Sequence, residues 1–187
     1  MDVELYEKGM READRVIRGI GPDQYGAPTP CSEWDVRQLV NHMVFGNWMF
    51  ARAAAGERVA VDGDDDAEPD MVGDDPVLAF RDSAEAAVAA WRRHGVEELV
   101  HLPFADLPGA AAMRIHFKDV VVHTWDLARA TGQDEEMDPE LATAALEISH
   151  AVVNDELRQF GAFGPEVDVG DDAPVHHRLV AFLGRTP

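Results

Sequence analysis

Two residues on one predicted helix, Asp119 and His123, have the types and the spacing to bind a metal ion. They lie four positions apart, so their side chains stand one turn apart on the same helical face. Ile115 and Val122 share that face, which places it near the core, where an unpaired carboxylate or imidazole is costly. Carboxylate oxygen and imidazole nitrogen are good ligands for zinc, nickel and iron. The pair predicts either a metal site or a salt bridge, and the spacing by itself favours the salt bridge.

A third ligand for such an ion has to come from another segment. The chain has eight histidines, and His42 is the best candidate because it lies close to the apolar face of the second predicted helix. Cysteine ligation by a cluster is excluded, since Cys31 is the single cysteine of the sequence. We interpret its thiol as unreactive, because Glu33 and Asp35 oppose the positive end of the helix that follows it.

Two more residues of the helix that carries Asp119 and His123 could support the site. Asp126 lies three positions after His123 and could orient its imidazole, as carboxylates behind ligand histidines do; the alternative is a charge on the helix surface. His116 lies three positions before Asp119. It could be a fourth ligand or a base, and the alternative is a partly exposed helix residue.

The apolar pattern predicts a mainly helical chain. Ser32 and Asp35 suit a capping box at the start of the second helix, and Leu78, Val88 and Trp91 are expected in the core of the third. Long helices are predicted over residues 3–19, 33–55, 76–93, 111–131 and 139–160, with an extended segment at 96–107 and a short helix at 176–183. Long helices with little strand indicate a helical bundle, and we expect one domain over residues 1–187.

The charge balance excludes some partners. Asp and Glu number 36 against 16 Lys and Arg, for a net charge of -20, which repels a phosphate backbone and anionic membrane surfaces. The apolar runs are far shorter than the ~20 residues of a membrane span, and the charged N-terminal segment is unlike a signal peptide. We therefore expect a cytoplasmic protein that binds neither nucleic acid nor membrane.

Residues 57–75 form an acidic stretch. Asp62, Asp64 and Asp66 have the spacing of a calcium loop, but Ala67 replaces the turn glycine and Gly73 the bidentate glutamate. A solvated loop is the favoured interpretation, and a lid over a site is the alternative.

Two helical segments also carry a family resemblance. They are SEWDVRQLVNH at 32–42 and DVVVHTWDLARATG at 119–132, accompanied in the tail by GAFGPEV at 161–167 and RLVAFLGR at 178–185. These segments resemble the DinB/YfiT-like superfamily, in particular the actinobacterial branch related to the N-terminal domain of mycothiol-dependent maleylpyruvate isomerase. The resemblance implies an all-α DinB-like four-helix bundle with an additional C-terminal helix and a short tail.

The same resemblance implies a divalent metal held by His42, Asp119 and His123. Zinc is the expected ion, and nickel, iron and manganese are alternatives. The relatives usually have Glu where this chain has Asp119, which is one methylene shorter. Full isomerases also carry a larger C-terminal domain, whereas only a short tail follows the fifth predicted helix here.

The activity implied by the resemblance is that of a thiol-dependent transferase or isomerase. The metal would bind mycothiol, or another low-molecular-weight thiol, as a thiolate that attacks an electrophilic substrate. The three ligands would then only bind metal, and no catalytic base is identified. Two alternatives stay open: a metal-dependent hydrolase with His116 as its base, and a non-catalytic metal- or ligand-binding stress protein. Homodimers are common among bundles, so a dimer is a further expectation.

Overall fold

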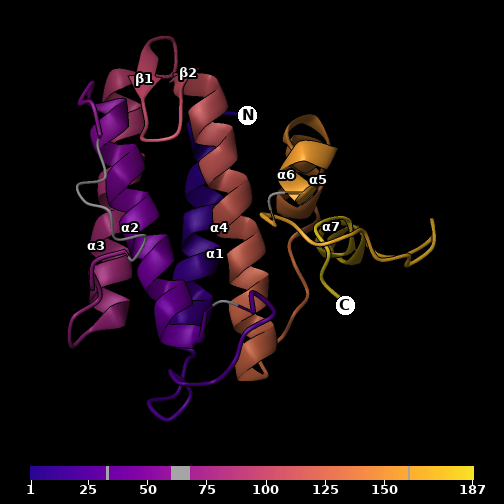
Figure 1. Ribbon diagram of the computed structural model, residues 1–187. Helices are drawn as coiled ribbons and strands as arrows, with labels where there is room; N and C mark the ends of the chain where they lie inside the picture. Colours follow the sequence, from indigo (N-terminus) through magenta and orange to yellow (C-terminus); the bar gives the residue numbers. More distant parts are fainter. Residues whose placement is uncertain (33, 60–67, 160) are drawn as a thin grey trace.

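Four long helices form a bundle in the computed structural model, which describes residues 1–32, 34–59, 68–159 and 161–187. They are α1 (Val3–Arg18), α2 (Val36–Ala54), α3 (Pro76–His94) and α4 (Gly109–Thr131) (Figure 1). Helices α1 and α2 each pack against both α3 and α4. The predicted all-α bundle is confirmed, and α2 and α4, which carry the candidate ligands, are neighbours in it.

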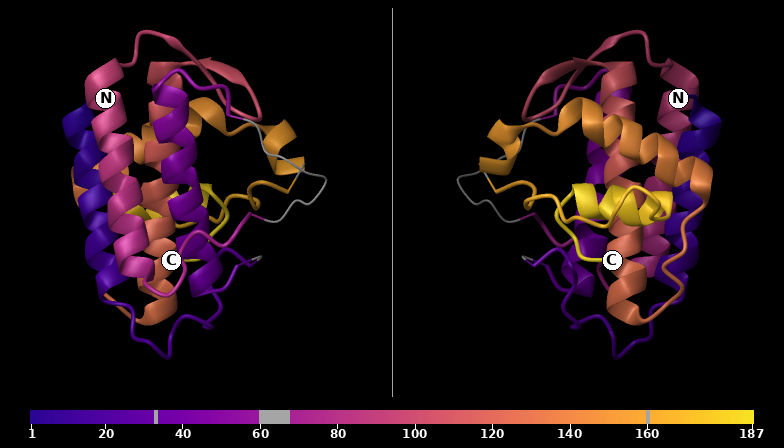
Figure 2. Two further views of the ribbon diagram at one scale, coloured as in Figure 1. Left: turned by 90° about the vertical axis from the view of Figure 1, so that its left-hand side faces the viewer. Right: turned by 90° about the vertical axis from the view of Figure 1, so that its right-hand side faces the viewer.

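The remaining elements lie at one end and along one side of this bundle. Strands β1 (Leu99–His101) and β2 (Asp106–Pro108) form an antiparallel hairpin between α3 and α4. Helix α5 (Pro139–Val152) packs on α4, and α7 (Val175–Phe182) packs on α5. Figure 2 shows α5 and α7 covering one side of the bundle. The additional C-terminal helix is therefore present, and it brings the tail of the chain back to α4.

The helix predicted over 139–160 is wrong in its second half. Helix α5 ends at Val152, and the short helix α6 (Asp155–Gln159) follows. Val153 is extended, with φ -84° and ψ 123°, and the Asn154 side chain accepts a hydrogen bond of 2.9 Å from the Leu157 backbone. Asparagine competes well for such capping positions, so it starts a new helix here rather than continuing the old one.

Helix α2 begins at Val36, three residues later than predicted. Its capping box joins Asp35 and Gln38, whose side chains and backbone N–H groups exchange hydrogen bonds of 2.8 and 3.0 Å. Ser32 is thus not the N-cap, because Asp35 has the acceptor that the first turn needs. Because of this shift, Trp34 lies in the loop before the helix. The Val36 N–H donates a hydrogen bond to the backbone oxygen of Ala27 in the same loop.

Helix α4 is buried around most of its circumference, because α1, α2 and α5 all pack against it. Its buried residues include charged and polar ones, among them Asp126 and His123. In α3, Val88 and Trp91 are buried as expected, whereas Leu78 is exposed in the first turn. Among the helices of the described ranges, none is both long and apolar enough to span a membrane.

Candidate metal centre

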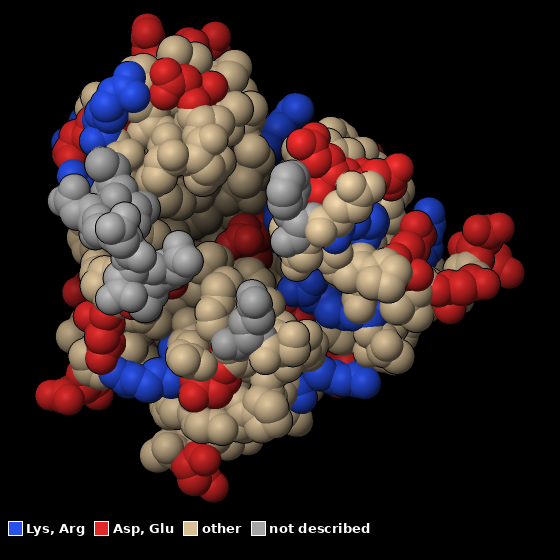
Figure 3. Space-filling view, viewed as in Figure 1, with Lys and Arg blue, Asp and Glu red and all other residues tan. Residues whose placement is uncertain are grey.

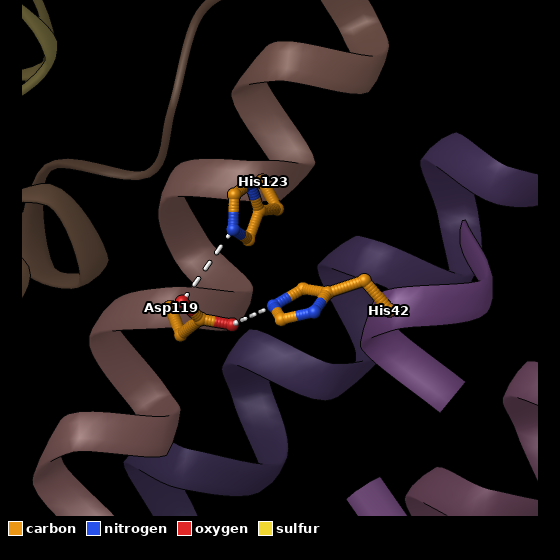
Figure 4. Close-up of side chains that lie close together, drawn as sticks. All are labelled: His42, Asp119 and His123. Atoms are coloured by element: carbon orange, nitrogen blue, oxygen red, sulfur yellow. Dashed lines mark ion pairs between the residues drawn. The ribbon is translucent and has the colours of Figure 1, made fainter. Parts of the chain in front are cut away.

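His42, Asp119 and His123 meet in the groove between α2 and α4 (Figure 4). Asp119 stands between the two imidazoles: its Oδ2 is 3.3 Å from Nε2 of His42, and its Oδ1 is 3.4 Å from Nε2 of His123. One ligand atom from each residue can be chosen so that all three lie within 4.8 Å of one another. Two helices therefore present two nitrogens and a carboxylate to a common point.

Each imidazole is held from behind by a second carboxylate. Nδ1 of His42 is 2.7 Å from Oε1 of Glu68, and Nδ1 of His123 is 3.0 Å from Oδ2 of Asp126. An ionised carboxylate can only accept, so each Nδ1 carries the proton and donates it. The Nε2 atoms are thereby left facing Asp119 with the tautomer that metal ligation requires.

Asp126 is itself fixed by the C-terminal tail. Its carboxylate is fully buried and accepts two hydrogen bonds from the Arg185 guanidinium, of 2.9 and 2.7 Å. This bidentate arrangement is the strongest geometry for such a pair. The sequence-based suggestion that Asp126 orients His123 agrees with these contacts.

The segment that supplies Glu68 is tied to the outer face of α2. The Asn41 side chain donates to the backbone oxygen of Pro69 at 2.9 Å and accepts from the Met71 N–H at 2.6 Å. One turn earlier, Arg37 forms an ion pair of 2.9 Å with Asp70. Residues 68–73 therefore hold their carboxylate against His42 through several anchors.

The earlier part of the acidic stretch carries the aspartates considered for calcium binding. Asp62, Asp64 and Asp66, considered above for calcium, lie outside the described residues. The calcium and lid interpretations therefore stay predictions.

The charges of the three residues are strongly coupled. Burial lowers the pKa of His42, but its contacts with Asp119 and Glu68 outweigh burial and raise this pKa to about 10. Burial raises the pKa of Asp119, yet the two histidines hold it well below its ordinary value. Without a metal ion, His42 and Asp119 are therefore an ion pair at neutral pH, and a metal would replace the proton on His42.

The donor set fits a divalent ion. Contacts of 3.3 and 3.4 Å are longer than good charge-assisted hydrogen bonds, which lie near 2.7–2.9 Å. These distances bring the two imidazole nitrogens and the carboxylate oxygens close enough to surround one ion. Two imidazoles and one carboxylate are the ligands of many catalytic zinc sites. In such sites the second nitrogen of each imidazole also donates to a carboxylate or carbonyl, as the Nδ1 atoms do here.

A cavity of about 490 Å³ opens in front of the three residues. Asp119 and His42 keep 31% and 23% of their side-chain surface exposed, so the site is accessible rather than sealed. Figure 3 shows this face of the molecule hollowed, with acidic atoms at the floor of the hollow. Other residues of the lining are Pro30, Cys31, Ser32, Trp34, Lys118, Val122, Gly161, Ala162, Phe163, Gly164, Leu183, Gly184 and Arg185.

Aromatic and cationic side chains shape the cavity. The Trp34 ring stacks on His42, with ring centroids 4.2 Å apart and planes at 26°. Lys118 is buried in the wall, and burial lowers the pKa of its ammonium. Sequence reasoning did not assign Glu68, Lys118 or Trp34 to the site.

His116 lies outside this cluster. Its Nδ1 is 2.8 Å from the Tyr6 hydroxyl, and its ring stacks on Phe50 with centroids 4.2 Å apart. The expectation of a partly exposed residue is wrong, because His116 is 1% exposed. Burial lowers its pKa to about 3, so it is neutral at ordinary pH. Tyr6 lies on α1 and Phe50 on α2, so these contacts hold the His116 ring in the core and away from the cavity.

Comparison with known proteins agrees with this architecture. The family model described as the mycothiol maleylpyruvate isomerase N-terminal domain matches residues 6–128, which include all of the three candidate ligands. The chain belongs to this family. The matched region contains most of α1, all of α2 and α3, and most of α4, so helices α5 to α7 follow it.

Relatives extend the similarity into the tail. Uncharacterized proteins from the CDC 1551 and H37Rv strains of Mycobacterium tuberculosis are 35% identical over 173 residues, which is 91% of this chain and 90% of each relative. A crystal structure of a mutant of the mycothiol-dependent maleylpyruvate isomerase has a TM-score of 0.61 and 12% identity. That match covers 85% of this chain and 70% of the isomerase, and it shows the shared fold.

Proposed function

We propose that this member of the isomerase N-terminal domain family is a divalent-metal-dependent enzyme that uses mycothiol or a related low-molecular-weight thiol. The thiol would either be transferred to an electrophilic substrate or promote isomerisation of that substrate. The observation that carries the proposal is the convergence of His42, Asp119 and His123 at the floor of an accessible cavity. The thiol is proposed because the family is named for a mycothiol-dependent maleylpyruvate isomerase. Zinc is the proposed ion, because this donor set is common for it.

The residues of the chain divide the work in a simple way. His42, Asp119 and His123 would hold the ion, while Glu68 and Asp126 keep their imidazoles in the binding tautomer. A divalent ion at this place supplies Lewis acidity, which favours the deprotonated and nucleophilic form of a thiol.

The walls of the cavity determine what can approach the ion. Trp34 and Val122 present apolar surface beside the ligands, which reduces access of water to one side. The cavity volume of about 490 Å³ lies in the range of small-molecule sites. These walls suit binding of an organic thiol together with a small substrate.

Two alternatives receive less support. A hydrolase would need a base at the cavity, and His116, the residue considered for that role, points toward Tyr6 instead. A purely structural metal site is usually closed by protein ligands, whereas Asp119 and His42 remain partly exposed.

Elemental analysis after incubation with zinc tests the metal site. We expect about one equivalent of zinc in the wild type and in a His94→Ala control, whose exposed histidine lies at the end of α3, and none in His123→Ala. No metal in the wild type would overturn the proposal.

Assays of electrophile consumption with and without mycothiol test the reaction. We expect consumption that needs both metal and thiol. Consumption with metal alone would indicate a hydrolase, and a metal-loaded protein that binds thiol without turnover would indicate a non-catalytic binding protein.

A further inference from the structure

Lys118 is a buried cation in the wall of the metal cavity. Its side chain is 9% exposed, and its Nζ is 4.0 Å from Oδ1 of Asp119, which is too far for a hydrogen bond. The same Nζ lies 4.9 Å from the centre of the Phe163 ring, which belongs to the C-terminal segment. Within the described ranges of the chain, the contacts of this ammonium are those with Asp119 and Phe163, and neither is a hydrogen bond.

A mostly buried ammonium without a protein acceptor is costly, since it has lost much of its hydration and its three donors are unused by the protein. The other cation of the cavity, Arg185, is in the opposite situation. Its guanidinium donates to both oxygens of Asp126 and to the backbone oxygen of Leu183. Lys118 is thus the cation of this wall that still has donors to offer to a ligand.

The surroundings indicate the kind of group that would meet Lys118. Lys118 offers one positive charge, since Arg185 in the same wall is already paired with Asp126, so these side chains would balance only half of the charge of a doubly charged phosphate. A carboxylate carries one charge, which matches the one cation, and its two oxygens can accept from the ammonium. Phe163 confines the ammonium on one side, which favours an approach from the cavity.

We propose that Lys118 is a specificity-determining residue, which selects for this cavity a ligand that carries a carboxylate. The inference rests on the proposed function, because it names the ligand class of the same site. The carboxylate can belong to the thiol or to the electrophile, and both sources offer Lys118 the same chemistry.

Matched pairs of small probes distinguish the two sources. N-acetylcysteine and N-acetylcysteamine are the same thiol with and without a carboxylate, and crotonate and crotonamide are a corresponding pair of electrophiles. Their binding to zinc-loaded protein is measured by calorimetry. In the wild type we expect the carboxylate member of one pair to bind about tenfold more tightly than its neutral partner.

Variants assign the preference to the residue. Lys118→Met removes the charge and keeps the length of the side chain, and we expect it to abolish the preference while the protein still binds about one equivalent of zinc. Lys118→Arg restores a cation and should recover part of the preference. The control is Lys8→Met, which changes the other lysine of the sequence; Lys8 pairs with Asp138 and Glu140 instead of lining the cavity.

The outcomes separate this inference from the proposed function. A wild type that holds zinc but shows no preference in either pair overturns the role of Lys118 and leaves the metal site standing. A preference that survives in Lys118→Met overturns it as well, because the carboxylate would then bind elsewhere. A wild type without zinc overturns the proposed function. Absence of the preference in the wild type overturns the role of Lys118 without any variant. If Lys118→Met fails to fold, Lys118→Gln makes the same test, and a preference that survives there overturns the role as well.

Discussion

The carboxylates behind His42 and His123, the two candidate ligand histidines, offer a matched test of the proposed site. Glu68→Gln and Asp126→Asn make the same chemical change, a carboxylate to a carboxamide of nearly the same shape. Glu68 lies on a loop with 26% of its side chain exposed, whereas the Asp126 side chain is fully buried and paired with Arg185. Both variants should therefore weaken metal binding, but only Asp126→Asn should strongly lower the free energy of unfolding.

The structure sets the expected magnitudes. Loss of a carboxylate behind a metal-ligating histidine reduces metal affinity by about 10–100-fold. We place Glu68→Gln near the lower value, because water already screens part of its charge. Asp126→Asn belongs near the upper value. It should also lower the free energy of unfolding by about 3–5 kcal/mol, because it leaves the buried Arg185 without its counterion.

Competition with a zinc chelator measures the affinities, and urea unfolding of the metal-free proteins measures the stabilities. Equal stability losses in the two variants would refute the assignment of Asp126 as a buried partner of Arg185. Unchanged zinc affinity in both would refute the role given to the two carboxylates.

Three further predictions follow from the same structure. The pKa of His42, raised to about 10, means that zinc must displace a proton, so zinc affinity should rise about tenfold per pH unit between pH 7 and 9, with release of one proton in calorimetry. In the metal-free protein, the stabilising contribution of His42 is complete below pH 6.5 and is lost as the pH rises toward 10. The pKa of His116 is lowered to about 3, so the free energy of unfolding should fall by about 1.4 kcal/mol for each pH unit below 6.5, because the unfolded chain takes up the proton first. His116→Phe should flatten that pH dependence in urea titrations. Gly184 has φ 88°, and a Cβ there would lie 2.6 Å from Cα of Gly164. Gly184→Ala should therefore destabilise the protein by more than about 1 kcal/mol, and by more than Gly170→Ala, which has φ 76° but open space around it.

Much of the site on α4 could be predicted from the sequence. Asp119, His123 and Asp126 follow one another at intervals of four and three, and a helix converts those intervals into a single face without help from the rest of the fold. The same rule puts His116 on this side of the helix, and the error there arose because Tyr6 and Phe50 hold its ring in the core, a tertiary contact that spacing does not show. His42 needed the family resemblance, since spacing says nothing about contacts between two helices.

Tertiary packing decided the remaining features. Glu68 reaches His42 because Arg37 and Asn41 anchor a loop, and such contacts have no period along the sequence. Lys118 is next to Asp119 and would be expected at the edge of that face; it is buried because the C-terminal segment places Phe163 over it. The sequence by itself determined which helical face carries the chemistry, since helix geometry is local. The loop and the tail decided how that face is enclosed, because their positions depend on contacts between residues far apart in the chain.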